Sequence, residues 1–214
     1  FCKEHNVECV MTSPDCATGT DRIADTIKQL GINPEFAVNM QGDTICPPWF
    51  IEAVVGAYVK DSNVQVVTPC VNLTWDELDR MRENKKTTPF TGTCAVVNHE
   101  TMDAYWFSKN IIPCMRKEKD LREKSEKSPV LRHIGLYGYR TDILHRIATL
   151  PESFYEKGSL EGLEQLRFIE NGIKVRVVEV DYRGLPAEMA GVDSPEDVAK
   201  AEAFLNKYGD KLVC

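Results

Sequence analysis

The chain has 214 residues, of which 43% are hydrophobic and 28% are charged, and its formal net charge is −7. This length suits a single domain with a sizeable core, which we expect to span 1–214. A surface that coats nucleic acid would be basic, and the longest apolar run, 51–59, is too short to cross a bilayer. We therefore expect neither nucleic acid nor a membrane as a partner.

The cysteine pattern favours a reducing compartment. The chain has eight cysteines, and none of them forms a C-x-x-C pair. Zinc ligation and a disulfide framework are therefore both poorly supported, and structural thiols in the cytoplasm fit better. The chain begins with Phe1, so the lack of a visible signal peptide decides little.

The first half of the chain alternates between predicted strands and helices. Strands are expected at 7–11, in the apolar stretch that starts at Phe36, and at 65–70. Helices are expected from an N-cap at Thr20 to about Leu30, from Pro47-Pro48 to about Lys60, and over 75–82. Such alternation favours parallel strands joined by right-handed crossovers. It predicts the α/β class with a mainly parallel sheet.

The pattern changes in the second half. Strands are predicted at 92–97, 104–108 and 134–140 with no long helix between them, which favours antiparallel pairing and a sub-lobe at about 92–140. The charged run 115–127 is expected to be a solvated loop, with an anion-facing flap as the alternative. Further helices are predicted at 142–148 and 160–170, the second capped by Asn171-Gly172, followed by a strand at 174–180.

The C-terminal segment predicts one more helix. Ser194 is expected as the N-cap, with Pro195 in the first turn and Asp197 three residues after the cap. The residues expected to be buried along one stripe are Val198, Ala201, Leu205 and Tyr208. Asp193 lies just outside the cap, so capping does not require it.

Two turns carry candidate chemistry. Gln41-Gly42-Asp43 ends an apolar strand, and ligands of open α/β sheets bind beyond such strand ends. A carboxylate there suits a hard cation such as Mg²⁺, although it could merely cap a turn. Gly19, ahead of a predicted helix, could present backbone N–H groups to a ligand or belong to a simple cap.

The sequence resembles the 3-deoxy-manno-octulosonate (Kdo) cytidylyltransferases, also called CMP-Kdo synthetases. The motifs that carry the resemblance lie in the family's order: Met11-Thr12-Ser13, Thr18-Gly19-Thr20-Asp21-Arg22-Ile23-Ala24, Val38-Asn39-Met40-Gln41-Gly42-Asp43, Tyr105-Trp106-Phe107-Ser108-Lys109, Leu131-Arg132-His133-Ile134-Gly135-Leu136-Tyr137-Gly138-Tyr139-Arg140, Leu163-Glu164-Gln165-Leu166-Arg167 and Gly191-Val192-Asp193-Ser194-Pro195-Glu196-Asp197.

The resemblance implies a Rossmann-like nucleotidyltransferase that converts CTP and an acid sugar to a CMP-sugar and pyrophosphate, for lipopolysaccharide biosynthesis. It implies Asp43 and Asp193 as Mg²⁺ ligands and Thr18-Gly19-Thr20 as a nucleotide contact. The side chains implied for the sugar pocket are Gln41, His133, Tyr137, Gln165 and, as a less certain match, Glu161, with Lys109 in place of the family's usual Arg. His133 alone would suit a core position equally well. A homodimer formed through 92–140 is also implied.

The chain departs from the family pattern in three places. The family opens with a strand and a P-A-R-x-x-S-x-R-x-P-G-K-P turn whose cations hold the triphosphate, and no such segment is present. Thr44-Ile45 replaces the usual Glu-Pro after Asp43, and Thr93-Cys94-Ala95 stands where a Lys is common. We therefore expect an N-terminally truncated sequence that is inactive alone. Synthesis of an amino-deoxy analogue and a non-catalytic binding module of the same fold are the alternatives.

Overall fold

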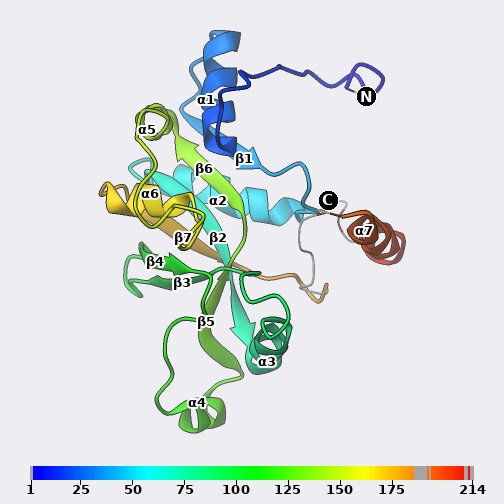
Figure 1. The fold of residues 1–214 in the computed structure, drawn as a ribbon, viewed down its shortest axis with the longest axis vertical. Coiled ribbons are helices and arrows are strands. Elements are labelled where there is room, and N and C mark those ends of the chain that lie inside the picture. Colours follow the sequence, from blue (N-terminus) through cyan, green and yellow to red (C-terminus); the bar gives the residue numbers. More distant parts are fainter. Residues whose placement is uncertain (1, 186–191, 193, 210–211, 213–214) are drawn as a thin grey trace.

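A sheet of seven strands forms the centre of the computed structural model, which describes residues 2–185, 192, 194–209 and 212 (Figure 1). The strands are β1 (Phe36–Met40), β2 (Val66–Thr74), β3 (Cys94–Val97), β4 (Ala104–Ser108), β5 (Lys127–His133), β6 (Leu136–Arg140) and β7 (Val175–Val180). Their order is β1-β6-β2-β5-β3-β4, and β7 pairs with β2.

The strand directions correct the predicted mainly parallel sheet, while the mixed α/β class is confirmed. Among the described pairings only β2 with β7 is parallel, and the others are antiparallel. Strands β1 and β2 do run in the same direction, as their helical connection requires. The late strand β6 lies between them and pairs antiparallel with both, so direct parallel contact between β1 and β2 is lost.

One edge of β2 is shared by two strands. Strand β7 pairs along Val66–Val71, so β5 and β6 must both use the opposite edge of β2. There β6 pairs with Val66 and Val67, and β5 pairs farther along, from Cys70 onward. The chain therefore passes from β5 to β6 opposite the middle of β2, and the turn between them interrupts the ladder.

Helices cover both faces of the sheet. They are α1 (Gly19–Leu30), α2 (Pro48–Lys60), α3 (Trp75–Asn84), α4 (Glu118–Lys124), α5 (Thr141–Ile147), α6 (Gln165–Glu170) and α7 (Pro195–Tyr208). One apolar cluster joins Val66 to α1, α5 and α6, and the other joins Val67 to α2 and α3. Successive β2 side chains thus enter the two cores on opposite faces. Within the described residues, no helix is long and apolar enough to span a bilayer.

The segment before α1 differs from its prediction. No strand forms at 7–11, where Val7 is 58% exposed and Met11 is 84% exposed. A strand needs neighbours for its backbone groups, and no described strand pairs with this segment. Helix α1 begins two residues earlier than predicted, because Thr18 rather than Thr20 is its N-cap. Its predicted end is confirmed by Gly31, which has a left-handed φ of 62°.

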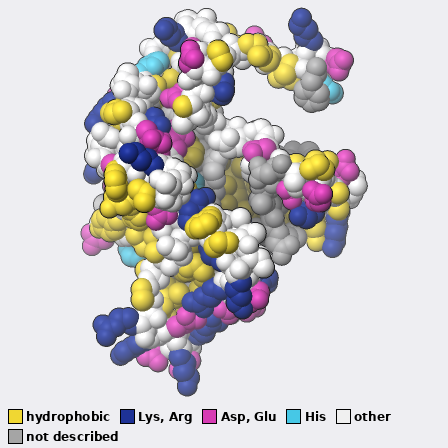
Figure 2. Space-filling view, in the orientation of Figure 1, with side chains coloured by type: hydrophobic (Ala, Val, Ile, Leu, Met, Phe, Trp, Pro, Cys, Tyr) yellow, Lys and Arg dark blue, Asp and Glu magenta, His cyan; other side chains and the backbone are white. Residues whose placement is uncertain are grey.

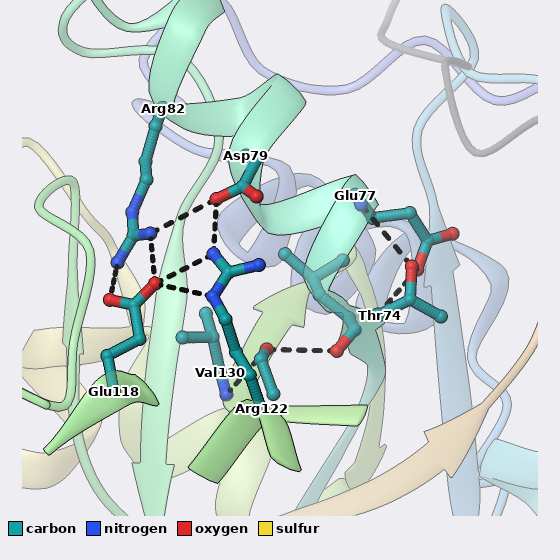
Figure 3. A network of polar contacts seen from close by, with 9 residues as sticks. Thr74, Glu77, Asp79, Arg82, Glu118, Arg122 and Val130 are labelled. Carbon is teal, nitrogen blue, oxygen red and sulfur yellow. Dashed lines mark hydrogen bonds and ion pairs between the residues drawn. The ribbon is translucent and has the colours of Figure 1, made fainter. Parts of the chain in front are cut away.

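The charged run 115–127 is more ordered than the solvated loop that we predicted. It contains α4 and the start of β5. The first side chains of β5 alternate between exposed and buried, and the later ones are all at least partly buried. Glu118 accepts hydrogen bonds from Arg82 and Arg122, and Arg122 also binds Asp79 at 2.7 Å (Figure 3). Charges of both signs intermingle at this end of the molecule (Figure 2). The guanidinium of Arg122 on α4 is therefore occupied by carboxylates of the same chain. This disfavours the alternative prediction that the run 115–127 is a flap that binds an anion.

Two later helices differ from expectation in extent or in their buried face. Helix α6 starts at Gln165 rather than at 160, because Gly162 has a positive φ of 62° and interrupts the helix. The Ser194 cap and its capping box with Asp197 are confirmed. The predicted stripe on α7 is wrong at Val198 and Leu205, which are each 45% exposed, whereas Tyr208 packs against the core as predicted, together with Phe204.

Candidate active site

The register of β1 and β6 brings the Gln41-Gly42-Asp43 turn beside the start of β6. Asn39 lies opposite Tyr137 and Met40 lies opposite Leu136. Because the strands are antiparallel, the chain leaves β1 where β6 begins. The polar turn after β1 and the segment between β5 and β6 therefore belong to the same region of the sheet.

His133 and Tyr137 flank the junction between β5 and β6. The rings of His133 and Tyr137 lie 5.4 Å apart between centroids, and Phe107 packs 5.1 Å from the His133 ring. The His133 Nε2 atom is 2.9 Å from the Thr68 Oγ1 atom on β2. The junction is held by the Ile134 amide, which donates to the Pro69 carbonyl at 3.0 Å. Both predicted sugar-pocket residues are thus fixed by the interrupted ladder.

The two rings are uncharged at neutral pH. Burial, with a smaller effect of the positive charge on Lys109, lowers the pKa of His133 to about 3. Burial also raises the pKa of Tyr137 well above its ordinary value. Both side chains can therefore act as neutral hydrogen-bonding groups, a role that suits sugar hydroxyls.

The N-terminus of α1 lies close to the end of β1. A Cβ atom on Gly19 would lie 2.9 Å from the Asn39 Nδ2 atom and 3.4 Å from the Gln41 Nε2 atom, so a side chain there would collide with Asn39. The Thr18 hydroxyl accepts from the Asp21 amide at 3.2 Å, which caps the helix. Thr20 is fully buried, and its hydroxyl lies 2.9 Å from the Tyr139 hydroxyl. Thr20 therefore anchors α1 to β6.

Gln165 opens α6 as a buried amide. It is 3% exposed, and its Nε2 atom has no hydrogen-bond partner among the described residues. A buried donor without a partner is costly, so it suits a position that a ligand completes. Gln41 is exposed, so these two predicted amides contribute one solvent-facing and one buried group.

Glu164, next to Gln165, is a candidate that the site prediction missed. Burial raises the pKa of its carboxyl, and hydrogen bonds with Thr20 and Thr18 oppose that shift. Its Oε1 atom has no partner within the described residues. The signal was present in the sequence, because Glu164 belongs to the same motif as Gln165. Its proximity to Thr18 depends on tertiary packing, which the motif alone does not reveal.

Glu161 and Lys109 form a second group of candidate side chains, at the end of β4. The Glu161 carboxylate accepts from the Ser108 hydroxyl and from the Lys109 amide, both at 2.8 Å. Both of its oxygens are thus used to hold the chain around Lys109. Burial lowers the pKa of the Lys109 amine, while the charge on Glu161 raises it. Lys109 is the cation that acts on His133, so it contributes positive charge to this region.

Asp43 is exposed at the end of the β1 turn. Its Oδ1 atom accepts from the Thr44 hydroxyl at 3.3 Å, and its carbonyl accepts from the Val192 amide at 2.7 Å. That bond brings the chain from near its C-terminus to Asp43, although Asp193 itself lies outside the described residues. No group of three His, Cys, Asp or Glu side chains with metal-binding geometry occurs within the described ranges. Mg²⁺ often binds one or two carboxylates together with substrate phosphates, so the donor chemistry of Asp43 fits this ion.

A hollow of about 690 Å³ lies between α1 and the C-terminal end of α5. It is lined by residues that include Ala24, Lys28 and Ala148, but neither Asp43 nor His133 reaches it. Asp25, another lining residue, already accepts hydrogen bonds from the Ser13 amide and the Gln29 side chain. The hollow therefore does not include the Asp43 turn or the β5–β6 junction.

Comparisons with known proteins agree on one family. The family model described as cytidylyltransferase matches residues 1–175. A 3-deoxy-manno-octulosonate cytidylyltransferase of Maricaulis maris is 42% identical over 204 residues, which are 95% of this chain and 74% of that protein. The Bacteroides thetaiotaomicron enzyme of the same name is 36% identical over 197 residues, covering 92% of this chain and 73% of the relative.

A solved structure extends this likeness to three dimensions. The structure of CMP:2-keto-3-deoxy-manno-octonic acid synthetase complexed with CTP superposes with a TM-score of 0.76 at 29% identity. The match covers 96% of this chain and 75% of that one.

Proposed function

Because the chain belongs to the cytidylyltransferase family, a family of nucleotidyltransferases, we propose that it joins Kdo to CMP, using CTP and releasing pyrophosphate. One observation carries this proposal: two neutral side chains that can bind a sugar, His133 and Tyr137, lie near the turn that contains Asp43. His133 and Tyr137 flank the start of β6, and register places the end of β1, which leads to Asp43, beside them. One substrate can thus lie over the β5–β6 junction while the other approaches the turn after β1.

In the proposed reaction the anomeric hydroxyl oxygen of Kdo attacks the α-phosphorus of CTP. A new oxygen–phosphorus bond forms, the bond to pyrophosphate breaks, and the hydroxyl proton is released. Gln41, His133, Tyr137 and Gln165 would orient the sugar through neutral hydrogen bonds, which favours reaction by fixing the attacking oxygen. Lys109 supplies the positive charge that a sugar carboxylate requires, and Glu161 holds the Lys109 backbone in place.

The nucleotide side of the site is assigned to the start of α1 and to the acidic turns. Gly19 allows the start of α1 to pack closely against Asn39 and Gln41, and Thr18 with Thr20 fixes this end of the helix, whose free backbone N–H groups would bind the nucleotide. Asp43 and Asp193 would hold Mg²⁺, which offsets negative charge on the phosphates when it is bound. The support is the exposed carboxylate of Asp43 and its main-chain bond to Val192, the neighbour of Asp193.

We also propose a cytoplasmic homodimer that serves lipopolysaccharide biosynthesis. The described cysteines are free, in keeping with a reducing compartment. Strand β4 lies at the end of the main strand path, and its Tyr105 side chain is 60% exposed. This exposed aromatic side chain in the 92–140 region would contact the second copy. Multi-angle light scattering at tens of micromolar should give twice the monomer mass, and a monomer there would contradict the dimer.

Substrate selection tests the proposed function. Pyrophosphate release should be measured for the full-length protein, with CTP, UTP or ATP and with Kdo, its 8-amino-8-deoxy analogue or N-acetylneuraminate. We expect the highest kcat/KM with CTP and Kdo. Preference for the amino sugar would support the alternative substrate. Binding of CTP and Kdo without turnover of any pair would support a non-catalytic module.

A further inference from the structure

Thr68 is a buried hydroxyl whose neighbours define the direction of its hydrogen bonds. Its side chain lies in the middle of β2 with no exposure to solvent. The Oγ1 atom is 2.8 Å from the Leu136 carbonyl oxygen, 3.3 Å from the Ile134 carbonyl oxygen and 2.9 Å from the His133 Nε2 atom. All three neighbours come from the β5–β6 junction.

Counting protons assigns each of these contacts. A threonine hydroxyl has one proton and can otherwise only accept, while a carbonyl oxygen only accepts. The short contact with the Leu136 carbonyl therefore requires the Thr68 proton, and the longer Ile134 contact can share it. No proton remains for Thr68 to donate to the histidine. The 2.9 Å contact with His133 is a hydrogen bond only if the His133 Nε2 atom is the donor.

We propose that Thr68 is a positioning residue that fixes His133 as the Nε2-protonated tautomer, so that the unprotonated Nδ1 atom accepts a hydrogen bond from a hydroxyl of the sugar. This inference rests on the proposed function, because it names the substrate group that this part of the site takes. The opposite tautomer would place two lone pairs against each other at the Thr68 contact. The ring stays neutral because burial lowers the pKa of His133 to about 3.

The tautomer also determines which group of an acid sugar can lie at His133. A lone pair on Nδ1 attracts a hydroxyl donor and repels a carboxylate, which is acceptor-only. The carboxylate must then lie toward Lys109, whose positive charge acts on the same histidine. Thr68 thus contributes to the orientation of the substrate without touching it. Phe107 and Tyr137 pack around the ring and limit its rotation.

The direct test is the tautomer in the wild-type, full-length protein without substrate. Long-range ¹H–¹⁵N correlation spectra of histidine-labelled protein distinguish protonated from unprotonated ring nitrogens. We expect His133 to have a protonated Nε2 and an unprotonated Nδ1 at neutral pH. A protonated Nδ1 would overturn the proposal. This measurement does not depend on any activity, so it remains informative even if Kdo proves not to be the substrate.

Kinetics of three variants test the positioning role. Thr68→Val removes the acceptor for His133, so we expect the Kdo KM to rise roughly tenfold with kcat changed less than about twofold. Thr68→Ser keeps the hydroxyl and should restore the KM, and Thr26→Val, which removes an exposed hydroxyl on α1, should change neither. An unchanged Kdo KM in folded Thr68→Val would overturn the role. If Thr68→Val does not fold, the tautomer spectrum of the wild type decides the role: a protonated Nε2 supports it and a protonated Nδ1 overturns it. Absence of turnover by the wild type would instead refute the proposed function.

Discussion

Asp43 is the side chain whose loss should affect turnover without affecting folding. It is exposed and its carboxylate accepts one long bond, from Thr44 at 3.3 Å. We predict that Asp43→Asn lowers kcat by roughly 100-fold or more, because a charge that balances the phosphates is lost. The thermal midpoint should stay within about 1 °C of wild type. Asp15→Asn, at another exposed acid with a single long bond, is the control. Wild-type turnover of Asp43→Asn at limiting Mg²⁺ would rule out the assigned role.

His133 should make stability depend on pH below neutrality. The unfolded chain takes up a proton near the ordinary pKa of about 6.5. The folded protein does not do so until the pH falls to the folded-state pKa of about 3, so stability is lost as pH drops through this interval. The slope contributed by one proton is at most about 1.4 kcal/mol per pH unit. Urea unfolding between pH about 7.5 and about 5 should show a flatter dependence for His133→Gln than for wild type. Equal slopes would show that His133 titrates normally.

The short helix α6 depends on a buried ion pair. Arg167 is 6% exposed and Glu156 is 8% exposed, and the Arg167 Nε atom donates to the Glu156 carboxylate at 2.9 Å. Glu156→Gln would leave the guanidinium without its charge partner, so we predict a loss of about 3–5 kcal/mol in the free energy of unfolding. The double variant Glu156→Leu with Arg167→Met should recover much of this loss. Denaturant unfolding measures both, and a single variant as stable as wild type would contradict the prediction.

Lys85 links the end of α3 to the backbone at Lys109, just after β4. Its Nζ atom donates to the carbonyls of Gly92 at 3.1 Å and of Lys109 at 2.6 Å, and burial lowers the pKa of this amine. Lys85→Met should cost about 1–3 kcal/mol because carbonyls lose their donor, and should raise the Kdo KM. Its exposed neighbour offers a matched control, since Lys86→Met removes only a surface pair and should cost less than about 1 kcal/mol. Equal unfolding energies for the two variants would contradict this role.

Local signals predicted the helices best. Pro48–Lys60 was expected almost to the residue, because Pro47-Pro48 and the apolar spacing are contained within the segment. The Ser194 cap was found for the same reason. Strand β5 was missed because charge dominates its start, while its stability comes from pairing with both β2 and β3. Val198 and Leu205 of the predicted α7 stripe are exposed because periodicity does not say which side of a helix meets the core.

For the whole molecule, sequence order did not reveal which strands are neighbours. The alternation of the first half predicted parallel pairs, but β6 arrives from a distant part of the chain and separates β1 from β2. The same limit applies to the site. Motifs identified His133 and Gln165, whereas the positions of Glu164 beside Thr18 and of Thr68 beneath His133 depend on contacts between distant elements.

The most direct test of the proposed chemistry follows the anomeric oxygen of Kdo. Kdo labelled with ¹⁸O at the anomeric hydroxyl should be incubated with CTP, Mg²⁺ and the full-length protein, and the products observed by ³¹P NMR. Attack on the α-phosphorus predicts equal amounts of pyrophosphate and CMP-Kdo, with the ¹⁸O retained in the bridge and an isotope shift on that phosphorus. Formation of CDP or of a Kdo phosphate, or loss of the label from the bridge, would contradict cytidylyl transfer by this protein.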